Sequence, residues 1–392
     1  MSGNSNKIAL ILILWGAGLL AGGQFAKVSI FLPEFQTIYP RQADQIAWLL
    51  TLVSVVGAVL GGAAASLANR FGLRHVLIVS LISAGGLSLW QATYPSFALM
   101  TLSRVVEGIT HLGIVVAAPA LMAEVSSDRW RGATMALWGT FFGVSFAIFG
   151  WFGIPFVEAF GVSGLLQLHS VCLFVIAGLA GLLLRGHSVF VVSGIASNHQ
   201  GKSALMAFQD ARVVWSGIGW LFYTLTFLAL LTILPAQLSE GLKPQITTAM
   251  SLVGIVTGML VLPVALLYLK ATTTVLAGFF AASLVTAVGA WFNPLILAIS
   301  LFAILGIIQS GTFAAVAELN HATDARTLGY GAMAQSGNLG NLVGTPMLLF
   351  VLENFDLSSL LITTSVIYGV GFLVLLHFTG RIRVVEKQNF RV

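Results

Sequence analysis

Long apolar segments recur along the whole chain, and they restrict its fold more than any other feature. Each has 18 or more residues, enough for a helix to cross the hydrocarbon core of a bilayer. The segments are continuous and lack the period of two of a membrane β-barrel, so helices must satisfy the backbone in lipid. The sequence therefore predicts an all-α polytopic membrane protein. Its twelve expected transmembrane helices lie near residues 8–32, 46–67, 74–94, 97–123, 133–157, 163–184, 213–236, 246–269, 273–292, 295–317, 329–352 and 358–379.

The composition agrees with a membrane protein and excludes other classes. Of the 392 residues, 58% are hydrophobic and only 8% are charged, whereas soluble domains average about 25% charged residues. The net charge of +5 is spread over short loops and does not cluster with exposed aromatic residues, which excludes nucleic-acid binding. Cys172 is the only cysteine of the chain, so an intrachain disulfide is impossible.

The longest polar break lies between residues 185 and 212, and it separates the expected helices into two groups of six. We therefore expect an N-terminal six-helix bundle at 1–185, a central cytoplasmic loop at 186–212 and a C-terminal six-helix bundle with a short tail at 213–392. The order Glu, Asp, Arg, Gly begins at Glu124 and recurs 194 residues later at Glu318, which favours two related halves.

The lysines and arginines predict the orientation of the helices. With a cytoplasmic N-terminus, fourteen of these cations lie on the inner side, and only Arg41 and Lys243 lie on the outer side. This asymmetry is the positive-inside pattern of membrane proteins. We expect both termini in the cytoplasm and a multi-pass protein of a cell membrane, in particular a bacterial inner membrane.

Three ionisable residues lie within the fourth apolar segment, namely Arg104, Glu107 and His111. At about 100° per residue, their spacing places them within about 60° of one another on a helix. An ionised side chain in hydrocarbon costs about 3 kcal/mol or more. We therefore expect this polar stripe to face a protein interior or a water-filled cavity rather than lipid.

Other polar side chains lie inside the expected helices. The first segment carries Gln24 and Lys27 on one helix face. Two interpretations of Lys27 are open: its ammonium reaches the outer membrane interface, or it faces a cavity shared with Arg104. Amides inside lipid must bond either to a neighbouring helix or to a ligand. The candidate solute-orienting residues are Gln24 and, in the second half, Tyr223, Gln309 and Asn338.

The polar stripe has the groups that proton coupling needs. An Arg close to Glu107 favours the ionised carboxylate, and a substrate anion that draws Arg104 away would let Glu107 take a proton. His111 titrates near neutrality and is a second candidate for the proton. The alternative interpretation is a buried structural pair of Arg104 and Glu107, with His111 donating to a carbonyl.

The loop after the second segment reads Asn69-Arg70-Phe71-Gly72-Leu73-Arg74, preceded by Gly61. It resembles the signature loop of the major facilitator superfamily, a Gly followed by Asp-Arg-x-Gly-Arg-Arg. Arg104 with Gly108 four residues later resembles the second motif of that family. The resemblance covers the whole chain. It implies two six-helix bundles and a secondary transporter that works by alternating access around a site near the bilayer midplane.

The signature loop departs from the family pattern at Asn69, which replaces the Asp, and at Leu73, which replaces one basic residue. In the family this Asp helps to latch the cytoplasmic halves together, so we expect a latch that is built differently. The expected cytoplasmic gate pairs Arg70 and Arg74 with Glu124 or Asp128, beside Asn69. The alternative is that these cations only set the topology.

The resemblance also bears on the substrate. Organic-anion carriers of this superfamily often have an Arg in the fourth helix and a Glu seven residues later. Arg104 matches the Arg, and His111 lies where that Glu would be.

We therefore expect a proton-coupled transporter of a small polar solute, in particular an organic anion. Arg104 and Lys27 would bind the anionic group, and Glu107 and His111 would carry the proton. Its expected partners are the solute, protons and membrane lipid, and it is expected to act as a monomer. No nucleotide loop, metal cluster or nucleophile constellation is present in the sequence, so we expect no enzyme, cofactor or metal.

Two alternatives stand beside this expectation. One is a proton-driven efflux pump for drugs or secreted metabolites, which the aromatic-rich segments suit. The Gly-Pro pair of the family's antiporter motif is missing from the fifth segment, which counts against it. The other is a non-transporting membrane component, against which the lack of an extra soluble domain counts.

Overall fold

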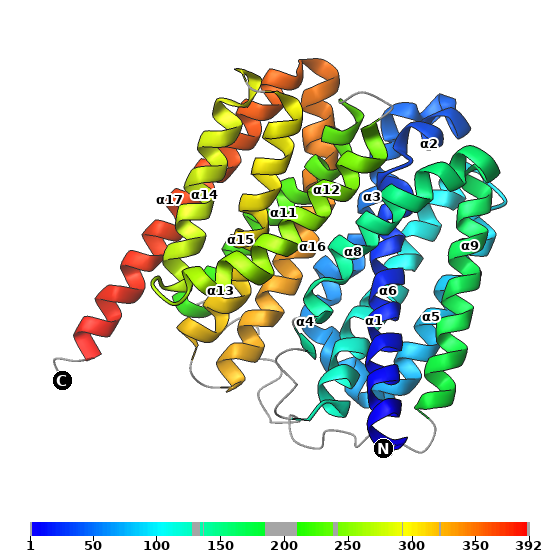
Figure 1. Cartoon of the computed structure of the whole chain (residues 1–392), viewed down its shortest axis with the longest axis horizontal. Coiled ribbons are helices and arrows are strands. Elements are labelled where there is room, and N and C mark those ends of the chain that lie inside the picture. Colours follow the sequence, from blue (N-terminus) through cyan, green and yellow to red (C-terminus); the bar gives the residue numbers. More distant parts are fainter. Residues whose placement is uncertain are drawn as a thin grey trace. The chain divides into compact units, whose positions relative to one another are not determined.

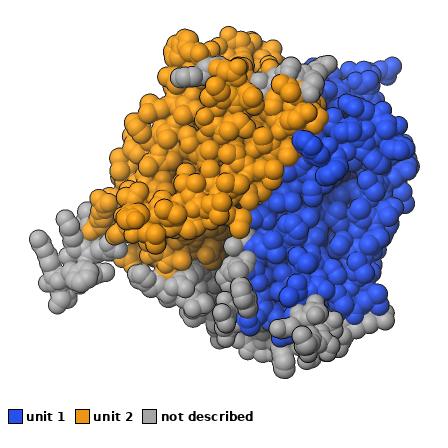
Figure 2. Space-filling model, in the orientation of Figure 1, with its two compact units in different colours: residues 1–196 blue, residues 197–392 orange. Residues whose placement is uncertain are grey.

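The computed structural model describes residues 2–127, 134–135, 137–184, 210–237, 242–291, 293–320 and 323–389. These residues form helices joined by short turns, and no strand occurs among them. They belong to two compact units, Met1–Ala196 and Ser197–Val392, which Figure 2 shows in different colours. The division at Ala196 falls within the expected central loop, most of which lies outside the described residues.

The N-terminal unit is built around one central helix, α6, which runs from Phe97 to Val125. Helices α1, α4 and α5 pack against it, and α1 also packs against α8 and α9 (Figure 1). The elements of this unit are α1 Ser2–Ser29, α2 Leu32–Ile38, η1 Pro40–Gln45, α3 Ile46–Thr51, α4 Val53–Phe71, α5 Leu73–Gln91, α6 Phe97–Val125, α8 Phe141–Ile148, the π-helix η2 Phe149–Gly153, and α9 Ile154–Leu183.

The C-terminal unit has its closest helix pair in α11 and α16. Helix α15 packs against α11, α12 and α14, and α17 packs against α11 and α14 (Figure 1). The elements of this unit are α11 Ala211–Ala236, α12 Lys243–Val256, the π-helix η4 Thr257–Val261, α13 Leu262–Ala265, α14 Ala271–Ala287, η5 Gly289–Trp291, α15 Pro294–Leu319, α16 Thr323–Asn354 and α17 Leu357–Asn389.

Nine helical segments of the described residues are long and apolar enough to cross a membrane. One of them, Phe141–Leu183, covers most of the fifth expected helix and nearly all of the sixth. Its backbone leaves the helical conformation at Gly161, where φ is +69°, which is the boundary between the two expected helices. The number of twelve and the cytoplasmic termini remain predictions.

Two expected helices are not among the nine. Helix α14 is apolar but only 17 residues long. Helix α16 has 32 residues, and amide side chains interrupt its apolar sequence. Both are helical in the structure, as the sequence predicts.

Four helices of the N-terminal unit divide along their length into an apolar half and a polar half. Leu14 of α1, Leu77 of α5, Leu121 of α6 and Leu173 of α9 belong to one buried apolar cluster. In each helix, that cluster lies on one side of a second group of buried residues, which are polar. The apolar half therefore packs the helices together, and the other half holds the site described next.

Candidate functional site

Arg104 and Glu107 form a buried ion pair on α6, one helical turn apart. Both side chains are fully buried. The Arg104 guanidinium also donates from Nε to the Leu49 carbonyl of α3 at 2.6 Å and from Nη2 to the Gln24 carbonyl of α1 at 2.7 Å. The pair therefore ties α6 to two other helices through charge-assisted hydrogen bonds.

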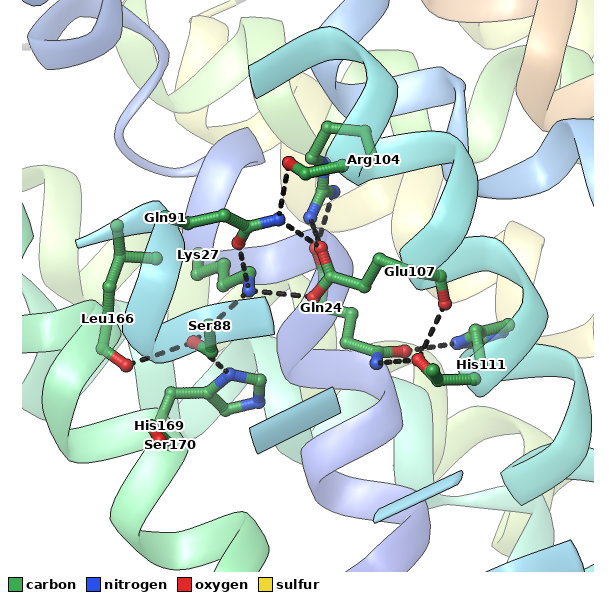
Figure 3. A network of polar contacts seen from close by, with 12 residues as sticks. Gln24, Lys27, Ser88, Gln91, Arg104, Glu107, His111, Leu166, His169 and Ser170 are labelled. Atoms are coloured by element: carbon green, nitrogen blue, oxygen red, sulfur yellow. Dashed lines mark hydrogen bonds and ion pairs between the residues drawn. The ribbon is translucent and has the colours of Figure 1, made fainter. Parts of the chain in front are cut away.

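Lys27 of α1 binds the same carboxylate. Its Nζ atom lies 2.7 Å from Glu107 Oε1, and it donates to Gln91 Oε1 of α5 at 2.9 Å (Figure 3). The Lys27 side chain is fully buried. The interpretation in which its ammonium reaches the membrane interface is therefore wrong, because the ammonium points into the bundle and pairs with Glu107.

Gln91 connects the members of this group, although its sequence position did not mark it as a candidate. It is the last residue of α5, and its amide Nε2 donates to Ser103 Oγ at 3.0 Å and to Glu107 Oε2 at 2.9 Å. Because Gln91 Oε1 accepts from Lys27, both the oxygen and the nitrogen of this amide are hydrogen-bonded. The sequence does contain a signal for Gln91. It is an amide at the end of an apolar segment, and it lies three positions after Ser88 and so on the same helix face.

A second branch leads from the backbone carbonyl of Glu107 to His111. Gln24 Nε2 donates to Thr110 Oγ1 at 3.2 Å, and Thr110 Oγ1 donates to the Glu107 carbonyl at 2.8 Å. Gln24 Oε1 accepts from His111 Nδ1 at 3.0 Å. The His111 ring lies edge-on to Phe25, with centroids 5.1 Å apart. The predicted residues Gln24, Lys27, Arg104, Glu107 and His111 thus belong to one hydrogen-bonded network (Figure 3).

His169 of α9 extends the network on the other side, and we did not single it out from the sequence. Its Nε2 lies 3.0 Å from the Leu20 carbonyl, which can only accept, so Nε2 carries a proton. Its Nδ1 lies 3.2 Å from Ser88 Oγ. Ser88 Oγ also accepts from Lys27 Nζ at 3.4 Å and lies 2.9 Å from the Leu166 carbonyl.

The single hydrogen of the Ser88 hydroxyl is shared between two acceptors. When His169 is neutral, Nδ1 is an acceptor and competes with the Leu166 carbonyl for this hydrogen. When His169 is an imidazolium, Nδ1 donates to Ser88 Oγ, and the hydroxyl then donates to Leu166. The geometry accommodates both protonation states of His169, within two hydrogen bonds of Lys27.

The formal charges of the network do not cancel. Lys27 and Arg104 bring two positive charges to one carboxylate, that of Glu107, and these are the ion pairs of the described residues. A buried charge without a counter-charge is costly. The arrangement is therefore suited to receive an additional anion, or to exchange one carboxylate for another on the same two cations.

The candidate residues of the C-terminal unit do not form such a network among the described residues. Tyr223 is buried between Trp220 and Phe227, with ring centroids 4.9 Å away on both sides, and its hydroxyl lacks a hydrogen-bond partner. Asn338 donates to the Ala334 carbonyl of its own helix at 2.9 Å. Gln309 is half-buried on α15.

The expected gate residues are only partly described. Asn69 and Arg70 lie in the last turn of α4, but their side chains are outside the described part, as is all of Asp128. Arg74 donates to the Gly181 carbonyl of α9 at 3.2 Å, and Glu124 is exposed. The pairing of these cations and carboxylates remains a prediction.

Glu318, the repeat equivalent of Glu124, has a defined role in the C-terminal unit. Its carboxylate accepts from the Ala271 backbone N–H at 2.5 Å and from Thr272 Oγ1 at 2.8 Å. It therefore caps the first turn of α14 from the end of α15, where a negative charge is favourable.

The comparison with known families agrees with this architecture. A family model described as Major Facilitator Superfamily matches residues 14–345, which is most of the chain. A search of the curated proteins found no match. The chain therefore belongs to the major facilitator superfamily, whose members are multi-pass membrane proteins and secondary transporters.

Proposed function

We propose that the protein is a proton-coupled transporter of a small organic anion, which binds at the buried network of the N-terminal unit. The observation that carries this proposal is the placement of two cations, Lys27 and Arg104, on the single carboxylate of Glu107. The proposal extends to a monomer with twelve transmembrane helices and cytoplasmic termini, in a bacterial inner membrane.

The charge balance favours an anionic solute. A solute carboxylate would displace Glu107 from Arg104 and Lys27, so the two cations would keep an anionic partner while the Glu107 carboxylate lost both of its own. The planar guanidinium of Arg104 suits bidentate recognition of a carboxylate. Gln24 of the same network, with Tyr223, Gln309 and Asn338 of the C-terminal unit, would orient the rest of the solute.

Proton coupling follows from the fate of Glu107 in this exchange. Once its two cations bind the solute, the carboxylate is an uncompensated charge in a medium of low polarity, and it gains stability by taking up a proton. His111, which is linked through Gln24 and Thr110 to the backbone carbonyl of Glu107, is the second group for this proton. Anion and proton binding then reinforce each other, as linkage requires.

Solute and proton would be released together when the site opens to the other side of the membrane. In this cycle, Asn69, Arg70, Arg74, Glu124 and Asp128 would form the cytoplasmic gate, with ion pairs that form in one state and break in the other.

The test is uptake into proteoliposomes with an imposed inward proton gradient. The probes are radiolabelled acetate, lactate, succinate and benzoate, with ethidium as a cationic dye. We expect uptake of at least one carboxylate to rise with the gradient and to fall when a protonophore is added. Carboxylate uptake that is insensitive to the gradient would contradict proton coupling.

Two variants assign the roles of the network. With Glu107→Gln, gradient-driven uptake of the transported carboxylate should be lost, whereas exchange of labelled for unlabelled carboxylate should continue. With Arg104→Ala, binding itself should be lost, while size-exclusion chromatography reports an intact fold. The exposed Arg383→Gln variant is the control and should behave like the native protein.

The efflux alternative predicts a different outcome of the same assay. It requires Glu107 to be available to a cationic substrate, but Lys27 and Arg104 already occupy its carboxylate. Gradient-driven movement of ethidium, without movement of any carboxylate, would favour efflux over our proposal.

A further inference from the structure

A groove on the surface of the N-terminal unit lies between α5 and α9 and takes no part in the polar network. Its volume is about 580 Å³, and its lining is apolar except at Arg74. The residues that define it here are Arg74, Ile78 and Ile82 of α5 and Phe174, Gly178 and Gly181 of α9. Because the chain is a multi-pass membrane protein, apolar side chains such as Ile82 and Phe174, which are exposed, face lipid.

Two glycines at the base of this groove, Gly178 and Gly181, leave its space unfilled because they have no side chain. A Cβ atom on Gly178 would meet no heavy atom within 4 Å, and one on Gly181 would meet only the Ile78 side chain at 3.7 Å. The Phe174 ring leans across onto Gly85 of α5, where a Cβ atom would lie 2.9 Å from it. The floor is therefore open, and an aromatic ring bridges the two helices beside it.

Arg74 places a cation at one end of the groove. It is the second residue of α5, and Ile82 lies eight residues further along, so the apolar part extends about 12 Å from the cation. Among the described residues, Arg74 donates only to the Gly181 carbonyl, at 3.2 Å, and has no carboxylate partner. The other guanidinium donors have no partner within the described ranges and can bind an anion.

This combination matches one kind of membrane component. A phospholipid has a phosphate next to an acyl chain, and arginine binds phosphate oxygens in bidentate fashion. A lipid headgroup with a net negative charge complements a cation that has no carboxylate partner in the described part of the chain. The expected orientation places Arg74 on the cytoplasmic side, where anionic lipids attract basic residues.

We propose that the groove between α5 and α9 binds an anionic phospholipid, with its phosphate on Arg74 and an acyl chain over Gly178 along Ile78, Ile82 and Phe174. This site is separate from the solute network, and the proposal does not depend on the transported solute. Arg74, which we also place in the cytoplasmic gate, would bind the phosphate in the state in which its gate ion pair is broken.

Native mass spectrometry of the full-length protein in detergent tests it, with phosphatidylglycerol and phosphatidylcholine of identical acyl chains as probes. We expect the native protein to bind phosphatidylglycerol about tenfold more tightly, because phosphatidylcholine has the same phosphate but adds a choline cation that Arg74 repels. Arg74→Gln should remove this preference, and Arg74→Lys should retain part of it. Arg383→Gln, which changes an exposed arginine elsewhere, should leave it unchanged.

The glycine floor provides a second, independent variant. Gly178→Leu should fill the groove and weaken the binding of both lipids. The matched control is Gly380→Leu, because Gly380 is also an exposed helical glycine with no heavy atom within 4 Å of a Cβ. Neither position is packed against other atoms, so both variants should fold, with an unchanged melting temperature as the check. The proposal is overturned if Arg74→Gln retains the preference, or if Gly178→Leu binds lipid as Gly380→Leu does.

Discussion

At the scale of single residues, Glu107 is the centre of the buried network. Its carboxylate binds Lys27 and Arg104 and accepts from the Gln91 amide, so three other side chains depend on it. Loss of the Glu107 carboxylate should therefore affect stability differently from loss of one of its two cations. Removal of the carboxylate leaves two buried cations together, whereas removal of Lys27 leaves a balanced pair of Arg104 and Glu107.

We predict that Glu107→Gln destabilises the protein more than Lys27→Met does. The first change should cost about 3–5 kcal/mol, because it leaves buried charges without a partner. The second should cost about 1 kcal/mol, for the hydrogen bonds that Gln91 and Ser88 lose. Unfolding by SDS in mixed micelles measures both. A larger loss with Lys27→Met would show that the ammonium, not the carboxylate, holds the network together.

Tyr39 allows a prediction about pH outside the expected transmembrane segments. Its hydroxyl donates to the Pro95 carbonyl at 2.8 Å. Burial, with a smaller contribution from Tyr94, raises the pKa of Tyr39 to about 12, whereas an unfolded chain has a tyrosine pKa near 10. A raised pKa means that the stabilisation is complete below about pH 10 and is lost as the pH rises through about 12.

We therefore expect Tyr39→Phe to be less stable than the native protein by about 1 kcal/mol at neutral pH, the usual value of one hydrogen bond. The difference should disappear as the pH rises through about 12. Absorbance of tyrosinate measures the titration directly, and the component lost in the variant should be the one near pH 12. If that component instead lies near pH 10, the phenol is not buried as the structure has it.

At the scale of helices, glycines set how closely neighbours approach. Gly340 and Gly344 lie one turn apart on α16, facing α11. A Cβ atom on Gly344 would lie 2.0 Å from the Leu225 carbonyl oxygen, and one on Gly340 would lie 2.1 Å from Thr224 Oγ1. The first of these neighbours is backbone and cannot move aside by a side-chain rotation. Small residues at four-residue spacing are typical of helix contacts in membranes.

We predict that Gly344→Ala separates α11 from α16 and lowers stability by about 1–3 kcal/mol, the cost of overpacking. Gly331→Ala on the same helix is the control, because a Cβ there would meet nothing within 4 Å. The control should be neutral or slightly stabilising, since alanine favours helix over glycine. Thermal unfolding in detergent compares the two, and equal melting temperatures would contradict the close contact.

At the scale of the whole molecule, the distribution of cations predicts which loops lie in the cytoplasm. The asymmetry of fourteen to two holds only if the chain crosses the membrane an even number of times between the termini. Nine segments of the described part of the chain are long and apolar enough by themselves. Twelve remains a prediction, which requires one of them to be divided at Gly161 and both α14 and α16 to cross the membrane.

Cysteine labelling tests this topology with little change to the protein, because Cys172→Ser removes the only cysteine. In that background, Lys243→Cys should react with a membrane-impermeant maleimide in intact cells. Lys7→Cys and Arg383→Cys should react only after permeabilisation. Labelling of one terminus but not the other in intact cells would mean an odd number of crossings.

The sequence predicted much of the site in the N-terminal unit but not its connections. Arg104, Glu107 and His111 stand out because ionisable groups are rare in apolar segments, and this rarity requires no structure to see. Gln91, Ser88 and His169 did not stand out, because isolated polar residues near helix ends are common and their importance comes only from their neighbours. The position of Lys27 was ambiguous, because a helix end in sequence does not reveal which way a long side chain turns.

The sequence by itself determined that this is an all-helical membrane protein of the major facilitator superfamily, because hydrophobic length, charge asymmetry and short motifs are local properties. Only the tertiary structure decided that Lys27, Gln91, Arg104 and Glu107 share one buried network, because these residues come from three helices and meet through packing. The excess of positive charge in that network is likewise a property of the assembled helices. It depends on which carboxylate each cation reaches, and no linear spacing specifies that.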